Sequence, residues 1–293
     1  MRIVYIGSVR FSLAALQKLV SLRVNIVGIC TLKSSSFNSD HVDLTSLGTT
    51  CGIPCYYADD INSHESLMWI RSKAPDVIFC FGWSRLLKNE LLGVAPLGVV
   101  GFHPAPLPAN RGRHPIIWAL ALGLRKTAST FFFMNEGADT GEIISQRDIL
   151  ISDDDNASTL YEKIINAAHL QIAEFIPELE GGMVKTTKQN ECLSNVWRKR
   201  SERDGVIDWR MSAKCIHNLV RALASPYNGA DFVVNGRVFK LWGSMLASGV
   251  SDNIEPGKVF AYSDFGPLVK CGEDAICLTK CEPLFEPNVG DYL

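Results

Sequence analysis

The chain has 293 residues, of which 47% are hydrophobic and 20% are charged, so it can form one large domain or two smaller ones with a sizeable core. The formal net charge is −2, which lacks the strongly basic balance typical of nucleic-acid-binding proteins, although a local basic patch is compatible with these totals. The composition therefore favours an ordinary globular protein that acts on something other than nucleic acid.

The N-terminus and the cysteines indicate a cytoplasmic protein. The run "MRIVYIGSVRF" is too short in apolar residues for a signal peptide, and no window approaches the length of a transmembrane span. The nine cysteines are scattered, without a CxxC pair, and we expect reduced thiols. Cys271, Cys277 and Cys281 lack a usual zinc spacing and have no histidine nearby, so we expect no metal.

The first half of the chain alternates strand and helix patterns. Apolar, β-rich runs predict strands at 2–7, 25–31, 76–82, 97–103, 127–135 and 148–152. Helical periodicity and end signals predict helices at 12–22, at 63–74 after Ser63, at 115–123 with proline in the first turn, and at 156–182 with Asn156 as cap. This alternation predicts an α/β domain, Rossmann-like, with a mostly parallel sheet.

The second half of the chain predicts a different architecture. Residues 183–205 are polar and charged, which indicates a linker after a first domain at 1–182. After it, 212–225 predicts a short helix, and the remaining strands and turns include the hairpin signal Asn235-Gly236. Residues 206–293 are therefore expected to form a small β-rich domain that resembles an open barrel.

Three loops are expected at the carboxyl ends of the predicted parallel strands, where α/β proteins bind their ligands. They are "GSVRF" (7–11), "FGWSRLL" (81–87) and "GFHPAPLPANRGRHP" (101–115). "GSVRFS" is neither a GxGxxG nor a GxxxxGK[ST] pattern, so a dinucleotide or a P-loop site is not expected.

His103 and Asp139 are the candidates for acid–base chemistry. His103 ends a strand and precedes a proline-stiffened loop, where an imidazole with a near-neutral pKa is well placed as a general base. Asp139 lies between two glycines in "NEGADTGEI", in a loop that could bring a carboxylate beside His103. The alternatives are a hydrogen-bonded structural histidine and a turn aspartate bonded to its own backbone.

Taken together, the motifs resemble the N10-formyltetrahydrofolate-dependent formyltransferases, which include methionyl-tRNA formyltransferase and the sugar N-formyltransferases. The run "GFHPAPLPANRGRHPIIWALALG" and the later "ADTGEIISQ" carry the resemblance, with His103, "PLP" (106–108), Arg111-Gly112 and Asp139-Thr140-Gly141 in the family's order. "PDVIFCFGWSRLLKNELL" (75–92) resembles the family's folate-contacting segment and "RDGVIDWRMSAKCIHNLVRAL" (203–223) its closing segment. The resemblance thus covers nearly the whole chain.

The resemblance implies transfer of a formyl group from N10-formyltetrahydrofolate, the co-substrate, to a primary amine. It implies that His103 takes the amine proton and that Asp139 positions this histidine. The implied cofactor-binding residues are Phe81, Gly82, Trp83, Arg85, Leu86 and Leu87. For Trp83, an ordinary half-buried tryptophan is the alternative to a wall of the pterin pocket.

The chain departs from the family at Gly101, where the family has an asparagine that donates a hydrogen bond to the oxyanion. Loss of one such donor lowers the rate by roughly 10²–10³. His114, which opens the next helix, and Asn110 in the loop are candidate replacements. Alternatively the reaction is slower or lost, and His114 is a helix-start histidine that touches solvent or a phosphate.

The acceptor amine remains open among three hypotheses. A nucleotide-linked amino sugar, for example a UDP- or dTDP-linked 4-amino-4,6-dideoxy sugar such as a pseudaminic-acid precursor, fits the near-neutral charge best. The alternatives are methionyl-tRNA and a non-catalytic folate- or sugar-binding role; a hydroxyornithine-type amine is more distant. Ser8, Arg10 and Arg200 are candidate substrate contacts, with a solvated linker as the alternative for Arg200. The family resemblance is compatible with a homodimer.

Overall fold

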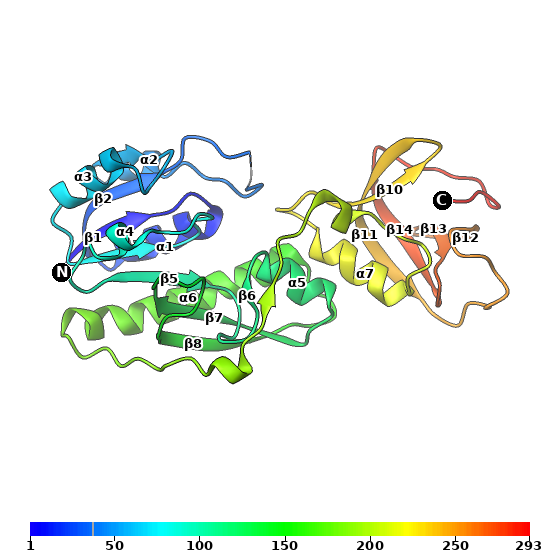
Figure 1. Ribbon diagram of the computed structural model, residues 1–293. Helices are drawn as coiled ribbons and strands as arrows, with labels where there is room; N and C mark the ends of the chain where they lie inside the picture. Colours follow the sequence, from blue (N-terminus) through cyan, green and yellow to red (C-terminus); the bar gives the residue numbers. More distant parts are fainter. Residues whose placement is uncertain (37) are drawn as a thin grey trace. The chain divides into compact units, whose positions relative to one another are not determined.

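The chain forms two compact units in the computed structural model, which describes residues 1–36 and 38–293 (Figure 1). Unit 1 comprises residues 1–115, 127–149 and 162–197, and unit 2 comprises residues 116–126, 150–161 and 198–293. Unit 2 therefore includes two short pieces from the first half of the chain, in addition to the C-terminal residues. The order of elements in the sequence does not reveal this exchange.

Unit 1 is built on a mostly parallel sheet, as predicted. Within the described residues the sheet has seven strands in the order β3-β2-β1-β4-β5-β7-β8, and the pairs from β3 to β5 are parallel while β5 and β7 are antiparallel. The strands are β1 (Arg2–Ile6), β2 (Asn25–Thr31), β3 (Cys55–Tyr57), β4 (Val77–Cys80), β5 (Val99–His103), β7 (Lys126–Phe133) and β8 (Ile143–Leu150).

The centre of this sheet is buried because its strands consist of apolar and aromatic residues. All four residues of β4 are buried, which is typical of parallel strands with both faces covered. Phe79 and Phe131 each lie against Phe175 of helix α6 (Ala157–Glu180), with ring centroids 6.3 and 5.0 Å away. Figure 1 shows α6 running along the sheet beside β5 and β7. This aromatic core fixes the sheet that carries His103.

The helices agree with the sequence signals at their ends. They are α1 (Arg10–Ser21), α2 (Thr45–Thr50), α3 (His64–Ser72), α4 (Asn89–Leu92), α5 (Pro115–Ala121) and α6. Ser63 caps α3 by accepting a hydrogen bond from the amide of Ser66 (3.2 Å). The Asn156 side chain accepts from the amides of Ser158 and Thr159 at 2.9 and 3.1 Å. Both predicted caps are confirmed.

Two segments differ from the sequence-based expectation. β8 begins at Ile143, five residues before the predicted strand, because an edge strand whose side chains are mostly half-buried or exposed carries a weak apolar pattern. Residues 183–205, whose polarity indicates a linker, contain the 3-10 helices Glu191–Leu193 and Glu202–Gly205 and strand β9 (Val196–Trp197). β9 pairs in parallel with β6 (Arg111–Gly112). Backbone hydrogen bonds form this ladder, so its side-chain composition reveals little.

Unit 2 contains the predicted β-rich region. In the part of the chain that is described, five antiparallel strands follow the order β10-β11-β14-β13-β12. They are β10 (Ala230–Val234), β11 (Arg237–Ala247), β12 (Val259–Ser263), β13 (Gly266–Lys270) and β14 (Ala275–Glu282), and helix α7 (Ala213–Ala222) precedes them. Asn235 and Gly236 have φ values of 51° and 77°, the geometry that a two-residue hairpin turn requires.

Membrane and cysteine features complete the fold. Across residues 1–36 and 38–293, none of the helices combines the length and the apolarity needed to cross a membrane. All nine cysteines are free thiols.

Candidate active site

His103 stands at the carboxyl end of β5 with only 5% of its surface exposed. Its Nε2 lies 2.8 Å from the backbone carbonyl of Asn110, and a carbonyl oxygen can only accept a hydrogen bond. A neutral His103 ring therefore carries its proton on Nε2. This tautomer leaves the lone pair on Nδ1, which is the atom available as a base.

Asp139 supplies a carboxylate on the Nδ1 side of His103. Its Oδ2 lies 3.7 Å from Nδ1, and the amide of Gly112 donates a hydrogen bond to the same oxygen at 2.9 Å. A carboxylate at this position favours the charged imidazolium that forms when Nδ1 accepts a proton. The backbone of Asp139 has φ = 58°, a left-handed conformation that residues other than glycine adopt uncommonly and that is often found at functional sites.

Asp139 reaches His103 by a different route from the one the sequence indicates. β7 is antiparallel to β5, so its last residue lies beside the start of β5 rather than at the edge that bears His103. The loop after β7 begins with Met134, whose amide donates to the carbonyl of Val99 at 2.7 Å. The residues that follow it then bring Asp139 back to the histidine. The carboxyl ends of β1, β4 and β5 lie side by side, as predicted.

Close backbone approaches explain the glycines of the two motifs. A Cβ atom at Gly112 would lie 2.3 Å from the carbonyl oxygen of Trp197, and the φ of Gly112 is 102°. A Cβ atom at Gly141 would lie 1.6 Å from the carbonyl oxygen of Phe133. No side chain fits at either position. "RG" and "DTG" are therefore the signatures of a packed backbone around Asp139.

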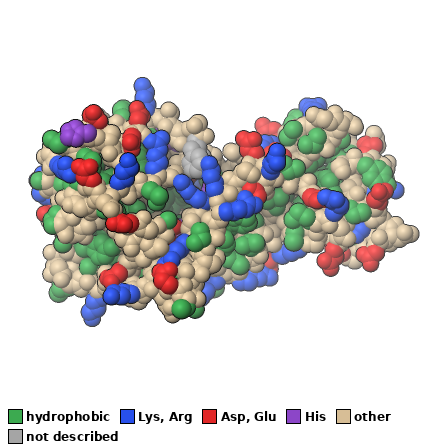
Figure 2. Space-filling view, viewed as in Figure 1, with side chains coloured by type: hydrophobic (Ala, Val, Ile, Leu, Met, Phe, Trp, Pro, Cys, Tyr) green, Lys and Arg blue, Asp and Glu red, His purple; other side chains and the backbone are tan. Residues whose placement is uncertain are grey.

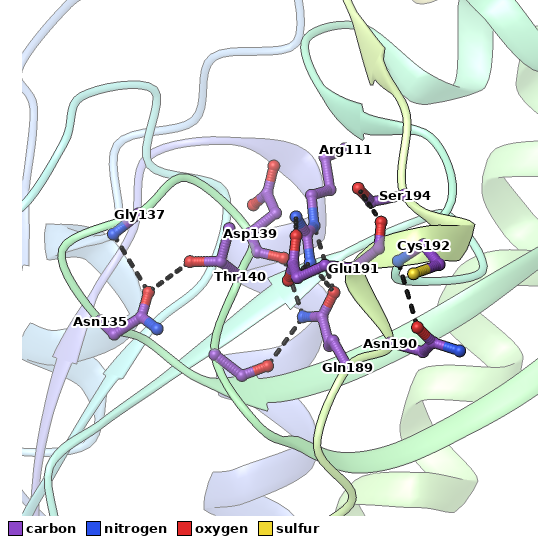
Figure 3. Close-up of polar contacts among 11 residues, drawn as sticks. Arg111, Asn135, Gly137, Asp139, Thr140, Gln189, Asn190, Glu191, Cys192 and Ser194 are labelled. Atoms are coloured by element: carbon purple, nitrogen blue, oxygen red, sulfur yellow. Dashed lines mark hydrogen bonds and ion pairs between the residues drawn. The ribbon is translucent and has the colours of Figure 1, made fainter.

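Arg111 is a buried cation beside this pair, and its side chain is 5% exposed. Figure 3 shows its guanidinium facing Gln189 and Glu191. Nη1 and Nη2 donate to the two carboxylate oxygens of Glu191 at 2.8 and 2.7 Å. The hydrogen bond to Glu191 raises the pKa of Arg111 above its ordinary value, and the same bond lowers the pKa of Glu191. This two-pronged pair fixes the plane of the guanidinium.

Gln189 connects Arg111 with the loop that carries Asp139. Its Oε1 accepts hydrogen bonds from Nε and Nη2 of Arg111 at 3.2 and 2.7 Å. Its Nε2 donates to the backbone carbonyls of Asp139 and Gly141 at 2.8 and 2.7 Å (Figure 3). The segment 183–205, whose composition indicates a linker, thus enters the site.

Gly101 is closely covered by Met134. Side chains two residues apart on a strand point to the same face, so a side chain at 101 would lie on the same face as His103. A Cβ atom there would lie 2.8 Å from Cγ of Met134 and 3.0 Å from Cζ of Phe132. Met134 therefore occupies the space that a longer side chain at this position would need. A thioether cannot donate a hydrogen bond to an oxyanion.

The two suggested replacements for the missing donor lie in the loop between β5 and α5. Asn110 has φ = 65° and reaches His103 through its backbone carbonyl; its backbone amide donates to Oδ1 of Asn195 at 2.8 Å. His114 is half-buried, has φ = 57° and immediately precedes α5. Their role as donors to an oxyanion stays a prediction.

The expected cofactor residues 81–87 divide into buried and exposed side chains. The Phe81 ring lies wholly in the aromatic core, 5.3 Å from that of Phe79, and Leu87 is also buried, so neither side chain is open to a ligand. Gly82 has φ = 68°, which its lack of a side chain permits. Trp83 is half-buried, and its Nε1 is buried without a hydrogen-bond partner among the described residues. The exposed members are Arg85, which donates to the carbonyl of Asp59, and Leu86.

The expected substrate residues are spread over both units. Ser8 is buried in unit 1, and its Oγ has no partner within the described part of the chain. Arg10 pairs with Glu162. Arg200 belongs to unit 2, where its guanidinium stacks 4.7 Å above the ring of Trp118. Within unit 1, the structure brings together His103, Asp139 and the Asn110 backbone.

Several site residues lie beyond what the sequence patterns indicate. Gln189, Glu191 and Asn195 contact residues about 50 to 85 positions earlier in the chain, and no local motif marks them. The motifs "RG" and "DTG" mark two backbone segments that pack closely together, but they do not reveal that Gln189 supplies the hydrogen bonds to the carbonyls of Asp139 and Gly141. Among residues 1–36 and 38–293, no group of three or more His, Cys, Asp or Glu side chains is placed to hold a metal ion.

Comparison with known families places both units. Residues 9–176 match the family described as formyl transferase, and residues 199–284 match the formyl transferase C-terminal domain. The two matches together cover most of the chain.

Solved structures with the same fold have low sequence identity to this chain. The chain is similar to HypX from Aquifex aeolicus (19% identity, TM-score 0.69), covering 96% of this chain and 45% of HypX, so it spans less than half of that protein. It is also similar to the N-formyltransferase from Helicobacter canadensis in complex with folinic acid and dTDP-3-aminofucose, with 16% sequence identity and a TM-score of 0.70. This match covers 94% of this chain and 98% of that protein. A third is the methionyl-tRNA formyltransferase from Clostridium thermocellum (18%, 0.62, covering 85% and 95%).

Proposed function

The chain belongs to the formyl transferase family, and on that premise we propose that it transfers a formyl group from N10-formyltetrahydrofolate to a primary amine. The observation that carries this proposal is the pairing of His103 Nδ1 with the Asp139 carboxylate at 3.7 Å, at the end of the buried strand β5. An imidazole held beside a carboxylate is the arrangement that general-base catalysis requires.

The tautomer of His103 gives the direction of proton movement. As the amine nitrogen attacks the formyl carbon, Nδ1 accepts one amine proton, and the charge that develops on the ring is stabilised by Asp139. When the tetrahedral intermediate collapses, the bond between the formyl carbon and N10 breaks, and N10 receives the proton that His103 had accepted, which returns the imidazole to its neutral form. The products are the formamide and tetrahydrofolate, so the amine has exchanged one hydrogen for the formyl group.

Trp83 supports a heterocyclic co-substrate near residues 82–87. Its indole N–H is buried and has no acceptor in the described part of the chain, which is unfavourable for a polar group. Trp83 is half-buried, so the exposed part of its ring is the surface that a pterin can stack against, and a shift of the side chain would bring the N–H to an acceptor on the pterin. Among the residues expected to bind the co-substrate, Gly82, Trp83, Arg85 and Leu86 remain open to a ligand; Phe81 and Leu87 contribute through the core.

A nucleotide-linked amino sugar is the proposed acceptor. The net charge is −2, and on the face in Figure 2 acidic and basic side chains are interspersed over the C-terminal strands of unit 2. A tRNA-binding enzyme is expected to carry a basic surface instead. The Helicobacter canadensis protein was solved with dTDP-3-aminofucose, a nucleotide-linked amino sugar of the general class proposed for this chain, with its amine at carbon 3 rather than carbon 4.

UDP- and dTDP-linked 4-amino-4,6-dideoxy sugars, including precursors of the pseudaminic acid type, are the acceptors to test first. Arg200, whose guanidinium stacks on the ring of Trp118 and donates to the carbonyl of Asp204, remains a candidate contact for their diphosphate. Ser8 and Arg10 remain candidate contacts at the end of β1. A homodimer that works in the cytoplasm is the proposed setting.

The test is a mass-spectrometric transfer assay. The wild-type protein is incubated with N10-formyltetrahydrofolate and separate UDP- and dTDP-linked amino sugars, methionyl-tRNA and free amines, beside His103→Ala. We expect a gain of one formyl group on a nucleotide sugar and none with the variant. Transfer to methionyl-tRNA instead would overturn the proposed acceptor. A folded protein that binds tetrahydrofolate but formylates none of these amines would support the non-catalytic alternative.

A further inference from the structure

We propose that Gln189 is a positioning residue, which holds Asp139 beside His103 and thereby determines the rate of proton transfer. This inference rests on the proposed function, because it assigns the rate-controlling geometry of the same site. It concerns a residue that touches neither the base nor, in our proposal, the substrates. Its effect is exerted entirely through the backbone of the Asp139 loop.

The Gln189 amide uses its full hydrogen-bonding capacity. Oε1 accepts two bonds from Arg111, while Nε2 donates one bond to the carbonyl of Asp139 and one to that of Gly141. A side-chain amide offers two acceptor sites and two donors, so none is left over. The amide cannot be flipped, because its NH₂ would then face a guanidinium and its oxygen would face two carbonyls. The four bonds therefore set both its place and its orientation.

The other end of this link is itself fixed. Arg111 is buried, is held by both oxygens of Glu191, and lies in the β6 strand that pairs with β9. In the same segment, Oδ1 of Asn195 accepts the backbone amide of Asn110, whose carbonyl fixes Nε2 of His103. One segment, 189–195, thus orients the base through Asn195 and its carboxylate partner through Gln189.

Asp139 needs such a restraint. Its backbone has φ = 58°, and its loop crosses back from the opposite end of β5. The separation of 3.7 Å between Oδ2 and Nδ1 is longer than a hydrogen bond, so a small displacement of the loop decides whether the two groups interact when the ring becomes charged. The two bonds from Gln189 to the loop oppose that displacement, together with the bond from the Gly112 amide to Oδ2 of Asp139.

Two substitutions separate positioning from stability. Gln189→Glu keeps an acceptor, now charged, for Arg111 but loses both donors to the loop, and Gln189→Ala loses all four bonds. We expect Gln189→Glu, whose second carboxylate oxygen would face the carbonyls of Asp139 and Gly141, to displace the loop and to lower kcat by about 10–100-fold while the protein stays folded at the assay temperature, as small misplacements of catalytic groups do. The KM for the co-substrate should stay within about twofold. Lys188→Ala, an exposed neighbour, is the matched control and should change neither value.

The Gly112 amide provides a readout that needs no substrate. It donates to Oδ2 of Asp139, so its hydrogen-exchange rate and its proton chemical shift in NMR spectra report where that carboxylate lies. We expect faster exchange in both Gln189 variants, approaching that of Asp139→Ala, and no change in Lys188→Ala.

Two results would overturn the inference: a Gly112 amide that behaves as in the wild type in Gln189→Glu, or an active wild-type enzyme whose kcat is unchanged by that variant. Should wild-type protein formylate no acceptor, the proposed function fails, while the Gly112 amide still decides whether Gln189 holds Asp139. A loss of kcat in Gln189→Glu that is fully accounted for by the fraction of unfolded protein at the assay temperature would assign Gln189 a structural role and would also overturn the inference.

Discussion

Two charged clusters, one in each unit, use the same chemistry to different ends. In unit 1, Arg111 binds Glu191 and Gln189 with a side chain that is 5% exposed. In unit 2, Asp153 lies 2.8 Å from Arg125 and 3.1 Å from Lys214, and its side chain is 59% exposed. Both clusters join chain segments that are far apart in the sequence.

The difference between them lies in what surrounds the charges. The Arg111 guanidinium is 5% exposed although its partner Glu191 is 66% exposed, so it is the buried cation that requires fixed partners and in turn fixes them. Around Asp153 water competes for every group, and such exposed pairs contribute little because their side chains remain mobile and screened. Burial of a charged side chain, rather than the number of its ion pairs, thus decides how firmly its partners are held in place. Of these two clusters, the one around Arg111 is joined through Gln189 to the loop of Asp139, the proposed partner of the base.

We expect the largest effect on kcat from removal of the Asp139 charge beside His103. Asp139→Asn retains an acceptor for the Gly112 amide but removes the charge beside His103, so we expect kcat to fall by about 10²-fold or more. Asp153→Asn, which removes an exposed carboxylate in unit 2, is the matched control and should leave kcat unchanged. Steady-state rates of formyl transfer decide the matter, and equal effects of both variants would contradict the distinction.

We expect the second largest effect at the buried Gly101, where an asparagine should change both the melting temperature and kcat. Gly101→Asn alone should lower the melting temperature, because its Cβ would meet Met134 at 2.8 Å. Gly101→Asn combined with Met134→Ala should restore the melting temperature and raise kcat by about tenfold or more, since an amide donor then faces the reacting centre. A folded double variant that is no faster than the wild type would show that another group already supplies the donor.

A third effect compares the two cations directly. Arg111→Met should lower the free energy of unfolding by about 2–4 kcal/mol. The substitution leaves Oε1 of Gln189 without a hydrogen-bond donor and removes the cation that binds Glu191. Arg125→Met removes an arginine that is exposed on the surface of unit 2 and should leave stability nearly unchanged. Urea unfolding monitored separately for each unit measures both. Similar losses in the two variants would be evidence against the role of burial.

The smallest effect is the acid dependence of the exposed cluster. Hydrogen bonds from Arg125 and then Lys214 lower the pKa of Asp153 from 3.8 to about 2. Because the folded-state pKa lies below the ordinary value, this contribution to stability is present above pH 3.8 and is lost as the pH falls toward 2. Asp153→Asn should remove that part of the acid dependence, and high salt should weaken it. Melting curves between pH 2 and 5 with and without salt would show it; a steeper loss in the variant would reverse the sign of the argument.

The alternating elements could be predicted because each signal is local. The apolar run of β4 and the caps Ser63 and Asn156 are readable from a few consecutive residues. β8 begins earlier than its apolar residues indicate, because an edge strand takes its pairing from the backbone. The same reason hides β9 in a polar segment.

The site was predictable only where a motif names the residue. His103 and Asp139 could be singled out from "FHP" and "DTG", and the structure places them together. The position of the Phe81 ring could not be predicted, because a strand-end phenylalanine in a motif does not reveal that its ring turns into the core. Gln189 was beyond prediction, because its four bonds exist only once three distant segments have met.

The parallel ladder between β6 and β9 also orders events during synthesis. The ribosome releases His103 and Asp139 well before residues 189–197, so a nascent chain carries both reactive side chains before it carries the segment that aligns them. Chemical competence therefore arrives last in unit 1, with the emergence of a short polar stretch. A fragment that ends at residue 182 would contain His103 and Asp139 but would lack Gln189 and Asn195, whose hydrogen bonds hold the two loops in place.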